Sequence, residues 1–131
     1  MQVTSSAVSL TVDDVAASSA FFTDHLGFRE EMASDGFASL GRSDAAMNIV
    51  LLRRGIEILP PAYRDQHAAG VIVALVVTDL EGELARLRGE GVAISMALRE
   101  EPWGERLFQV LDPNGIVIEL VEWVDPQATT L

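Results

Sequence analysis

Apolar and polar positions in the first part of the chain predict a strand, a helix and three further strands. Residues 8–12 alternate between apolar and polar, which is the two-residue period of a half-buried strand. Asp13 and Asp14 then offer an N-cap for a helix that ends at Gly27. The predicted buried stripe of this helix consists of Val15, Ser18, Phe22 and Leu26. The three strands are expected at residues 28–32, 37–41 and 47–52, separated by turns at 34–36 and 42–44.

The same order of elements returns after residue 70. Residues 75–80 match residues 10–15 at an offset of 65 positions. Thr78 and Glu81 have the spacing of a capping box, and the glycines at 89 and 91 end the second predicted helix. Its apolar stripe consists of Leu80, Leu84 and Leu87. With strands expected at residues 92–98, 107–111 and 116–123, the chain contains a βαβββ module twice, and the predicted fold class is α+β.

Residues 54–70 lack either period and separate the two modules. The pair Pro60-Pro61 cannot lie inside a sheet. We therefore expect one domain over residues 1–131, with module one at about 6–53, a linker at about 54–70 and module two at about 71–124. Residues 125–131 are predicted to form a frayed tail.

The C-terminal hairpin contains the most specific local sequence. Asp112-Pro113-Asn114-Gly115 lies between two apolar runs, where Pro113 fixes φ and Asn114 and Gly115 accept positive φ. The next strand carries one acid, Glu119, among apolar neighbours. Burying a carboxylate alone is costly, so Glu119 must either face a cavity or have a partner such as Arg106.

Composition limits the classes of function. The chain has 131 residues, 49% of them hydrophobic, and no Cys, which excludes disulfides and thiolate chemistry. Its N-terminus lacks a signal peptide pattern and its longest apolar run, residues 71–77, is too short to span a bilayer, so we expect a soluble cytoplasmic protein with no membrane partner. The net charge of −11 argues against nucleic acid and favours a cationic ligand, although acidic composition also serves solubility.

Three motifs resemble those of the vicinal oxygen chelate superfamily, which includes glyoxalase I, extradiol dioxygenases and bleomycin resistance proteins. They are the segments that open the helices at 12–15 and 77–80, the Leu26-Gly27-Phe28 segment, and Asp112-Pro113-Asn114-Gly115 followed by Glu119. Residues 35–38 and 101–106 are most similar to the bleomycin resistance branch. The resemblance implies two modules that form a cupped mixed sheet, and a homodimer in which the N-terminal strand is exchanged.

Enzymes of this superfamily usually hold a divalent metal, and the resemblance assigns its ligand positions. The two positions seven residues before the helix-capping acids are Ala7 and Ile72, neither of which can donate a lone pair. The position on the first module's last strand is near Asn48 or Val50, and Glu119 alone stands where a ligand is expected. One carboxylate does not make a transition-metal site, and His25 and His67 lie elsewhere, so no metal or other cofactor is expected.

Strand alternation predicts which residues face the cup. On the first strands of the modules these are Ala7, Ser9 and Thr11, and Ile72, Ala74 and Val76; on the last strand they are Val117, Glu119 and Val121, with Ile118 and Leu120 toward the helices. Trp103, in a Pro-Trp-Gly loop, is favoured as a planar ligand contact, whereas Phe37 is equally well explained as a core residue. The predicted ligand-binding residues are Trp103, Phe37, Glu119, Asn48, Arg106 and Ser9.

The predicted function is that of an antibiotic-sequestering protein, which binds a planar, cationic natural product without chemistry. Neither a Ser-His-Asp pattern nor a phosphate-binding glycine loop is present, and Glu101 and Glu105 are better explained as solvated charges than as an acid/base pair. The alternative is a metal-dependent lyase or isomerase of the same superfamily with differently placed ligands. A structural or regulatory dimer is a third class, for which the sequence contains no positive signal.

Overall fold

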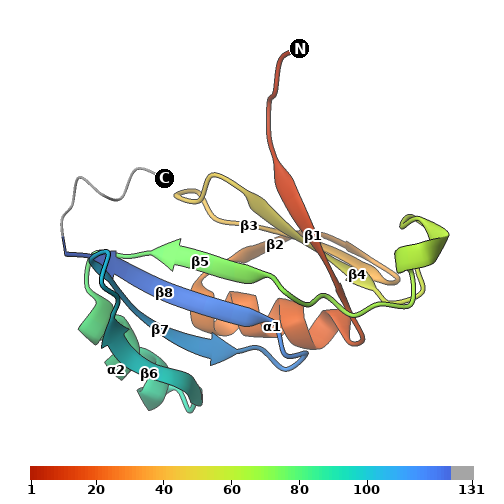
Figure 1. Cartoon of the computed structure of the whole chain (residues 1–131). Coiled ribbons are helices and arrows are strands. Elements are labelled where there is room, and N and C mark those ends of the chain that lie inside the picture. Colours follow the sequence, from red (N-terminus) through yellow and green to blue (C-terminus); the bar gives the residue numbers. More distant parts are fainter. Residues whose placement is uncertain (125–131) are drawn as a thin grey trace. The chain divides into compact units, whose positions relative to one another are not determined.

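The computed structural model describes residues 1–124, and the predicted frayed tail, residues 125–131, lies outside this range. The chain divides into two compact units, Met1–Ala69 and Gly70 onward. Each unit contains one helix and one four-stranded mixed sheet (Figure 1). The α+β class and the doubled βαβββ order are therefore confirmed.

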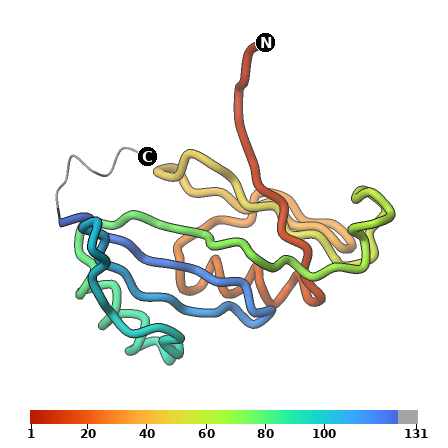
Figure 2. Tube along the Cα trace, viewed as in Figure 1, coloured from red at the N-terminus to blue at the C-terminus, as the bar shows by residue number. Residues whose placement is uncertain are grey.

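The first unit is built from β1 (Ala7–Val12), α1 (Val15–Leu26), β2 (Arg29–Ser34), β3 (Phe37–Gly41) and β4 (Asn48–Arg53). The strand order is β1-β4-β3-β2, in which β1 is parallel to β4 and the other pairs are antiparallel. The segment that follows includes a short 3-10 helix, η1 (Pro61–Tyr63). Figure 2 shows how the residues before β1, all of them exposed, extend away from this sheet.

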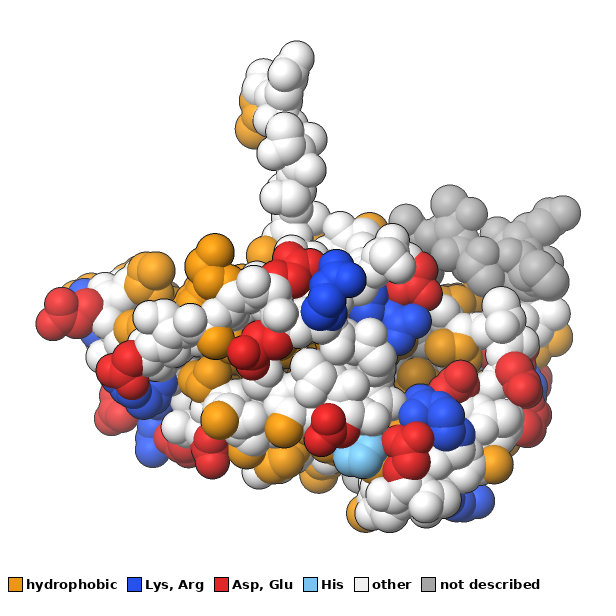
Figure 3. Space-filling model, turned by 180° about the vertical axis from the view of Figure 1, so that it is seen from behind, with side chains coloured by type: hydrophobic (Ala, Val, Ile, Leu, Met, Phe, Trp, Pro, Cys, Tyr) orange, Lys and Arg blue, Asp and Glu red, His pale blue; other side chains and the backbone are white. Residues whose placement is uncertain are grey.

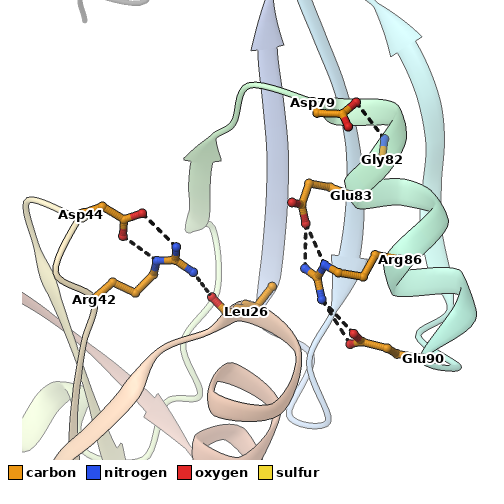
Figure 4. A network of polar contacts seen from close by, with 8 residues as sticks. All are labelled: Leu26, Arg42, Asp44, Asp79, Gly82, Glu83, Arg86 and Glu90. Carbon is orange, nitrogen blue, oxygen red and sulfur yellow. Dashed lines mark hydrogen bonds and ion pairs between the residues drawn. The ribbon is translucent and has the colours of Figure 1, made fainter.

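Local sequence explains both ends of α1. The Asp14 carboxylate accepts a hydrogen bond from the Ala17 amide at 3.0 Å, as predicted for an N-cap. Gly27 ends the helix with φ of 70°, in the left-handed region where glycine carries no steric cost. Arg42 donates to the last-turn carbonyl of Leu26 and pairs with Asp44 at 2.7 Å (Figure 4). Phe22 and Leu26 are buried as predicted, Val15 is only half-buried, and Ser19 joins the buried face.

The second unit contains β5 (Ile72–Val76), α2 (Leu80–Gly89), β6 (Ile94–Glu100), β7 (Glu105–Leu111) and β8 (Val117–Trp123). Its strand order, β5-β8-β7-β6, repeats that of the first unit, with β5 parallel to β8. The stripe of Leu80, Leu84 and Leu87 is buried as predicted. Glu83 and Glu90 pair with Arg86 along the exposed side of α2 (Figure 4).

The predicted capping box of α2 is wrong by one residue. Asp79, not Thr78, is the N-cap, and its carboxylate accepts from the Gly82 amide at 3.1 Å (Figure 4). This places Asp79 at the position that Asp14 occupies in the first module, so the two helices begin in the same way. Capping by aspartate is at least as favourable as capping by threonine, which accounts for the shift.

Two turns of the second unit have the same geometry. In Asp112–Ile116 the Gly115 amide donates to the Asp112 carbonyl at 2.9 Å, and the Asp112 amide donates to Ile116 at 3.0 Å. In Glu101–Glu105 the corresponding bonds, from Gly104 to Glu101 and from Glu101 to Glu105, measure 2.9 and 2.8 Å. Gly104 and Gly115 have φ of 90° and 82°, whereas no described non-glycine residue, Asn114 included, has positive φ. The expectation of positive φ at Asn114 is therefore wrong, because a single glycine closes the turn.

Among residues 1–124, no helix has both the length and the apolar character needed to cross a membrane.

Candidate ligand-binding faces

The two faces of the second sheet differ in what covers them. Glu81 of α2 bonds to Arg106, and Arg106 pairs across the sheet with Glu122 at 3.2 Å, which fixes the even-numbered residues of β7 and β8 on the α2 side. The odd-numbered residues therefore occupy the opposite side, here called the helix-free face. By register this face comprises Ile72, Ala74, Val76, Glu105, Leu107, Gln109, Leu111, Val117, Glu119, Val121 and Trp123.

Glu119 lies in the middle of the helix-free face and is buried, with 8% of its surface exposed. Its cross-strand neighbours are Ala74 and Gln109. The Gln109 side-chain amide donates to Glu119 Oε1 at 2.9 Å, and no basic residue in the described part of the chain pairs with this carboxylate. Glu119 is thus a buried acid whose one hydrogen-bond donor in the described part of the chain is neutral.

The surroundings of Glu119 are mainly apolar. Leu107 and Val121 are buried beside it, whereas Ile72, Val76 and Leu111 on the same face are exposed, Ile72 to 53%. Large apolar side chains exposed together on one face are typical of a binding surface rather than of a core. The prediction that Ile72, Ala74 and Val76 lie on the face away from the helix agrees with the register.

Trp103 occupies the turn between β6 and β7 and is 63% exposed. Pro102 and Gly104 are explained by the turn, since proline suits its first central position and Gly104 supplies the positive φ. The turn does not require an aromatic residue at position 103. The Trp103 Nε1–H donates to Glu105 Oε1 at 3.2 Å, which holds the indole at the β7 end of the sheet.

Arg106 lies on the α2 side of the sheet and not on the face of Glu119. Its guanidinium bonds to both Glu81 and Glu122, so the partner expected for Glu119 is committed elsewhere, and Gln109 takes that place. The hydrogen bond from Arg106 holds the pKa of Glu81 below its ordinary value. Arg106 therefore links α2 to its sheet through its bonds to Glu81 and Glu122.

In the first unit, Ser9, Phe37 and Asn48 share the face opposite α1. Ser19 of α1 bonds to Glu30, and Glu30 pairs in register with Leu40, which places the even-numbered residues of β3 on the α1 side and Phe37 on the other. Ser9 and Asn48 follow from the registers of β1 and β4. The space beside Gly41 on this face is filled by the Glu31 carboxylate and the Asn48 amide.

A separate pocket of about 570 Å³ lies between the start of α1 and the β2–β3 turn. Phe37 is the single predicted site residue that lines it. Its four acids each have a partner: Asp13 pairs with Arg54, Asp35 with Arg53, Asp14 caps α1, and Glu30 accepts from Ser19. The hydrogen bond from Arg53 also holds the pKa of Asp35 below its ordinary value. The pocket contains no acid that a ligand would have to satisfy.

The residues at the superfamily's metal-ligand positions do not fit a transition metal. Ala7 lies beside Asn48 in the first sheet, and Ile72 lies beside Val117 in the second. Residues 1–124 contain no group of three or more His, Cys, Asp or Glu side chains placed to hold a metal ion. His25 packs edge-on against Phe21, and His67 Nδ1 lies 3.1 Å from the Ala68 carbonyl oxygen. We therefore propose no reaction step that uses a metal ion.

The sequence analysis did not predict the polar residues Gln109 and Glu105 on the helix-free face. Gln109, the donor to Glu119, can be found only once the register of β7 against β8 is known. Glu105 was expected to be a solvated charge outside the strand predicted at residues 107–111, whereas β7 already begins at this residue. Residues 105–111 show no strict alternation of apolar and polar side chains, so the two-residue period does not indicate that the strand begins at Glu105.

Residues 4–120 match the sequence profile of the Glyoxalase/Bleomycin resistance protein/Dioxygenase superfamily. The chain belongs to this superfamily, as its doubled βαβββ modules indicate. A search of proteins with curated descriptions found no significant match.

Solved structures with the same fold include proteins with different descriptions. A glyoxalase/bleomycin resistance protein/dioxygenase from Nocardioides is 22% identical, with a TM-score of 0.76 over 96% of this chain and 87% of that one. Lactoylglutathione lyase from Agrobacterium tumefaciens is 16% identical, with a TM-score of 0.73 over 96% of each chain. TioX from Micromonospora sp. ML1 is 21% identical, with a TM-score of 0.73 over 92% of this chain and 99% of that one. At these identities the similarity establishes the fold alone.

Proposed function

We propose that the protein binds a planar, cationic organic molecule on the helix-free face of its second sheet and sequesters it without chemistry, in the manner of the bleomycin resistance branch. The observation that supports this proposal most strongly is Glu119, a buried carboxylate among apolar neighbours whose one hydrogen-bond donor among residues 1–124 is the neutral amide of Gln109. A buried charge without a counter-charge is costly, and a cationic ligand would supply that counter-charge.

Two further features support an aromatic ligand. Trp103 exposes a large planar surface that its turn does not require, and Ile72 and Val76 add exposed apolar area on the face of Glu119. Aromatic stacking contributes about 0.5–1.5 kcal/mol beyond the burial of apolar area. The proposed ligand therefore has a flat ring system and a cationic group, and we also propose that two copies of the chain form a homodimer with equivalent sites.

The test uses a matched pair of probes. Daunorubicin is planar and cationic, whereas N-acetyldaunorubicin has the same rings without the charge. We expect Glu119→Gln to weaken daunorubicin binding about tenfold, as for the loss of a charge-assisted hydrogen bond, and to leave N-acetyldaunorubicin unaffected. The melting temperature should stay near that of the parent protein, because Gln109 can donate to the new amide oxygen as well.

Trp103→Ala should also weaken both probes about tenfold, because it removes the stacking surface that they share. Isothermal titration gives the affinities, and native mass spectrometry with bleomycin and daunorubicin, with and without EDTA, gives subunit count and bound metal. Absence of binding by every probe would refute the proposal. Stoichiometric zinc, iron or nickel in untagged protein would instead favour the metal-dependent lyase or isomerase.

A further inference from the structure

The β7 end of the helix-free face contains a carboxylate between two indoles. Glu105 and Trp123 are directly opposite each other in the β7–β8 register, and both lie on the side away from α2. Side chains in such a pair have Cβ atoms about 4.5–5.5 Å apart. Trp103, which donates to Glu105 Oε1 at 3.2 Å, approaches the same carboxylate from the turn.

Glu105 has no basic partner in the described part of the chain. The two nearest arginines in the β6–β7 hairpin are committed elsewhere, Arg106 to Glu81 and Glu122 on the α2 side and Arg99 to Glu101 at 2.6 Å. The hydrogen bond from Trp103 satisfies one carboxylate oxygen and leaves the negative charge uncompensated. Glu105 is therefore available to a cation from outside the chain.

We propose that Trp103, Glu105 and Trp123 form an organic-ammonium subsite, in which a methylated ammonium group contacts the Glu105 carboxylate and the indole faces. An alkylated cation suits these residues, since it is attracted both to aromatic faces and to a carboxylate without needing further hydrogen-bond acceptors. The hydrogen bond to Glu105 fixes the Trp103 ring before the ligand arrives. The Trp123 Nε1–H is buried and has no acceptor among the described residues, so Trp123 does not compete for the Glu105 oxygens.

This inference rests on the proposed function in that it gives a cationic ligand a second anchor on the same face. Four residues along a strand span about 13 Å. Glu105 is four residues from Gln109, the cross-strand neighbour of Glu119. A ligand head group at Glu105 is therefore distinct from a group at Glu119, and the two sites are separable by mutation.

The experiment titrates the full chain with choline and with 3,3-dimethyl-1-butanol, its neutral isostere, followed by proton–nitrogen NMR. The chain has two Trp residues, so two indole N–H signals are expected, assignable with Trp123→Phe. Choline should shift both signals and the neutral alcohol should shift neither. Glu105→Gln should weaken choline binding about fivefold, the effect of one contact between unit charges at 4 Å in water.

Glu100→Gln is the matched control. It removes the same charge from the same hairpin, but Glu100 is exposed and pairs in register with Arg106, on the α2 side. Equal shifts by choline and the alcohol, or equal weakening by the two substitutions, would overturn the subsite. If daunorubicin still binds in a Glu119-dependent manner, the proposed function survives that result; if choline binds but daunorubicin does not, the proposed function fails and the subsite stands.

Discussion

The hydrogen bond from Gln109 to Glu119 shows how a single side-chain amide reduces the free-energy cost of burying a carboxylate. The bond between them measures 2.9 Å and is the one side-chain hydrogen bond of Glu119 within residues 1–124, and both residues lie on the helix-free face. Glu105 is the contrasting case, since its donor is an exposed indole rather than a residue of the sheet interior. The two carboxylates therefore play different parts: Glu119 lies deep in the face and Glu105 lies at its end.

Gln109→Leu should lower the free energy of unfolding by about 1–3 kcal/mol, because it leaves the Glu119 carboxylate without its donor. The double substitution Gln109→Leu/Glu119→Leu removes both polar partners and should recover most of that loss. Urea unfolding of the two variants measures the difference. A double variant no more stable than the single one would mean that the bond contributes nothing beyond side-chain packing.

Elements with a strong period or a clear turn signal could be predicted from sequence. The helix from Val15 to Leu26 and the strand from Phe37 to Gly41 follow the predicted bounds because alternation and end signals agree. β7 begins two residues before the predicted strand, because Glu105 and Arg106 are both polar and precede the apolar residues that indicate a strand. The site was predicted less well than the fold, since the positions of Gln109 and Arg106 depend on strand register.

The turn that contains Pro102, Trp103 and Gly104 allows a test of whether the backbone conformation of the turn determines where the Trp103 side chain lies. Gly104→Ala should cost about 1–2 kcal/mol, because φ at this position is 90° and a side chain is strained there. The nearest atom to an added Cβ, Val124 Cβ at 3.9 Å, is at ordinary contact distance, so the cost comes from the backbone. This variant should also bind planar probes less well, since Trp103 is the proposed stacking surface.

Gly89→Ala is the control for that substitution. Gly89 is the last residue of α2, lacks positive φ, and has no atom within 4 Å of an added Cβ. Alanine is a better helix former than glycine by up to about 1 kcal/mol, so this variant should be slightly more stable. Thermal unfolding of both variants should shift in opposite directions, and a shared direction would contradict the assigned turn geometry.

At the scale of the whole molecule, one module is used twice but carries different chemistry in each copy. Both units have the same strand order and an aspartate cap on their helix. The face opposite α1 carries Ser9, Phe37 and Asn48, whereas the face opposite α2 carries Glu105 and Glu119 with two indoles nearby. The repeated scaffold therefore explains the fold, and the unrepeated residues of the second module explain the proposed preference for a cation.

The net charge of −11 should act on ligand association as well as on solubility. Acidic side chains are spread over the visible surface rather than gathered in one patch (Figure 3). A cationic ligand is attracted over a distance set by the Debye length, which falls from about 30 Å at 0.01 M salt to about 8 Å at 0.15 M. Association of daunorubicin should therefore slow about tenfold over this range, within the span that electrostatic steering covers.

Stopped-flow fluorescence measures that association rate directly. N-acetyldaunorubicin, which lacks the charge, should associate at a rate that salt hardly changes. The dissociation rate of daunorubicin should change much less than its association rate, because contacts at close range are screened less than long-range attraction. If salt changed the association rate of neither compound, the acidic surface would serve solubility alone. The preference for a cation would then depend on Glu105 and Glu119 and not on the other charges of the chain.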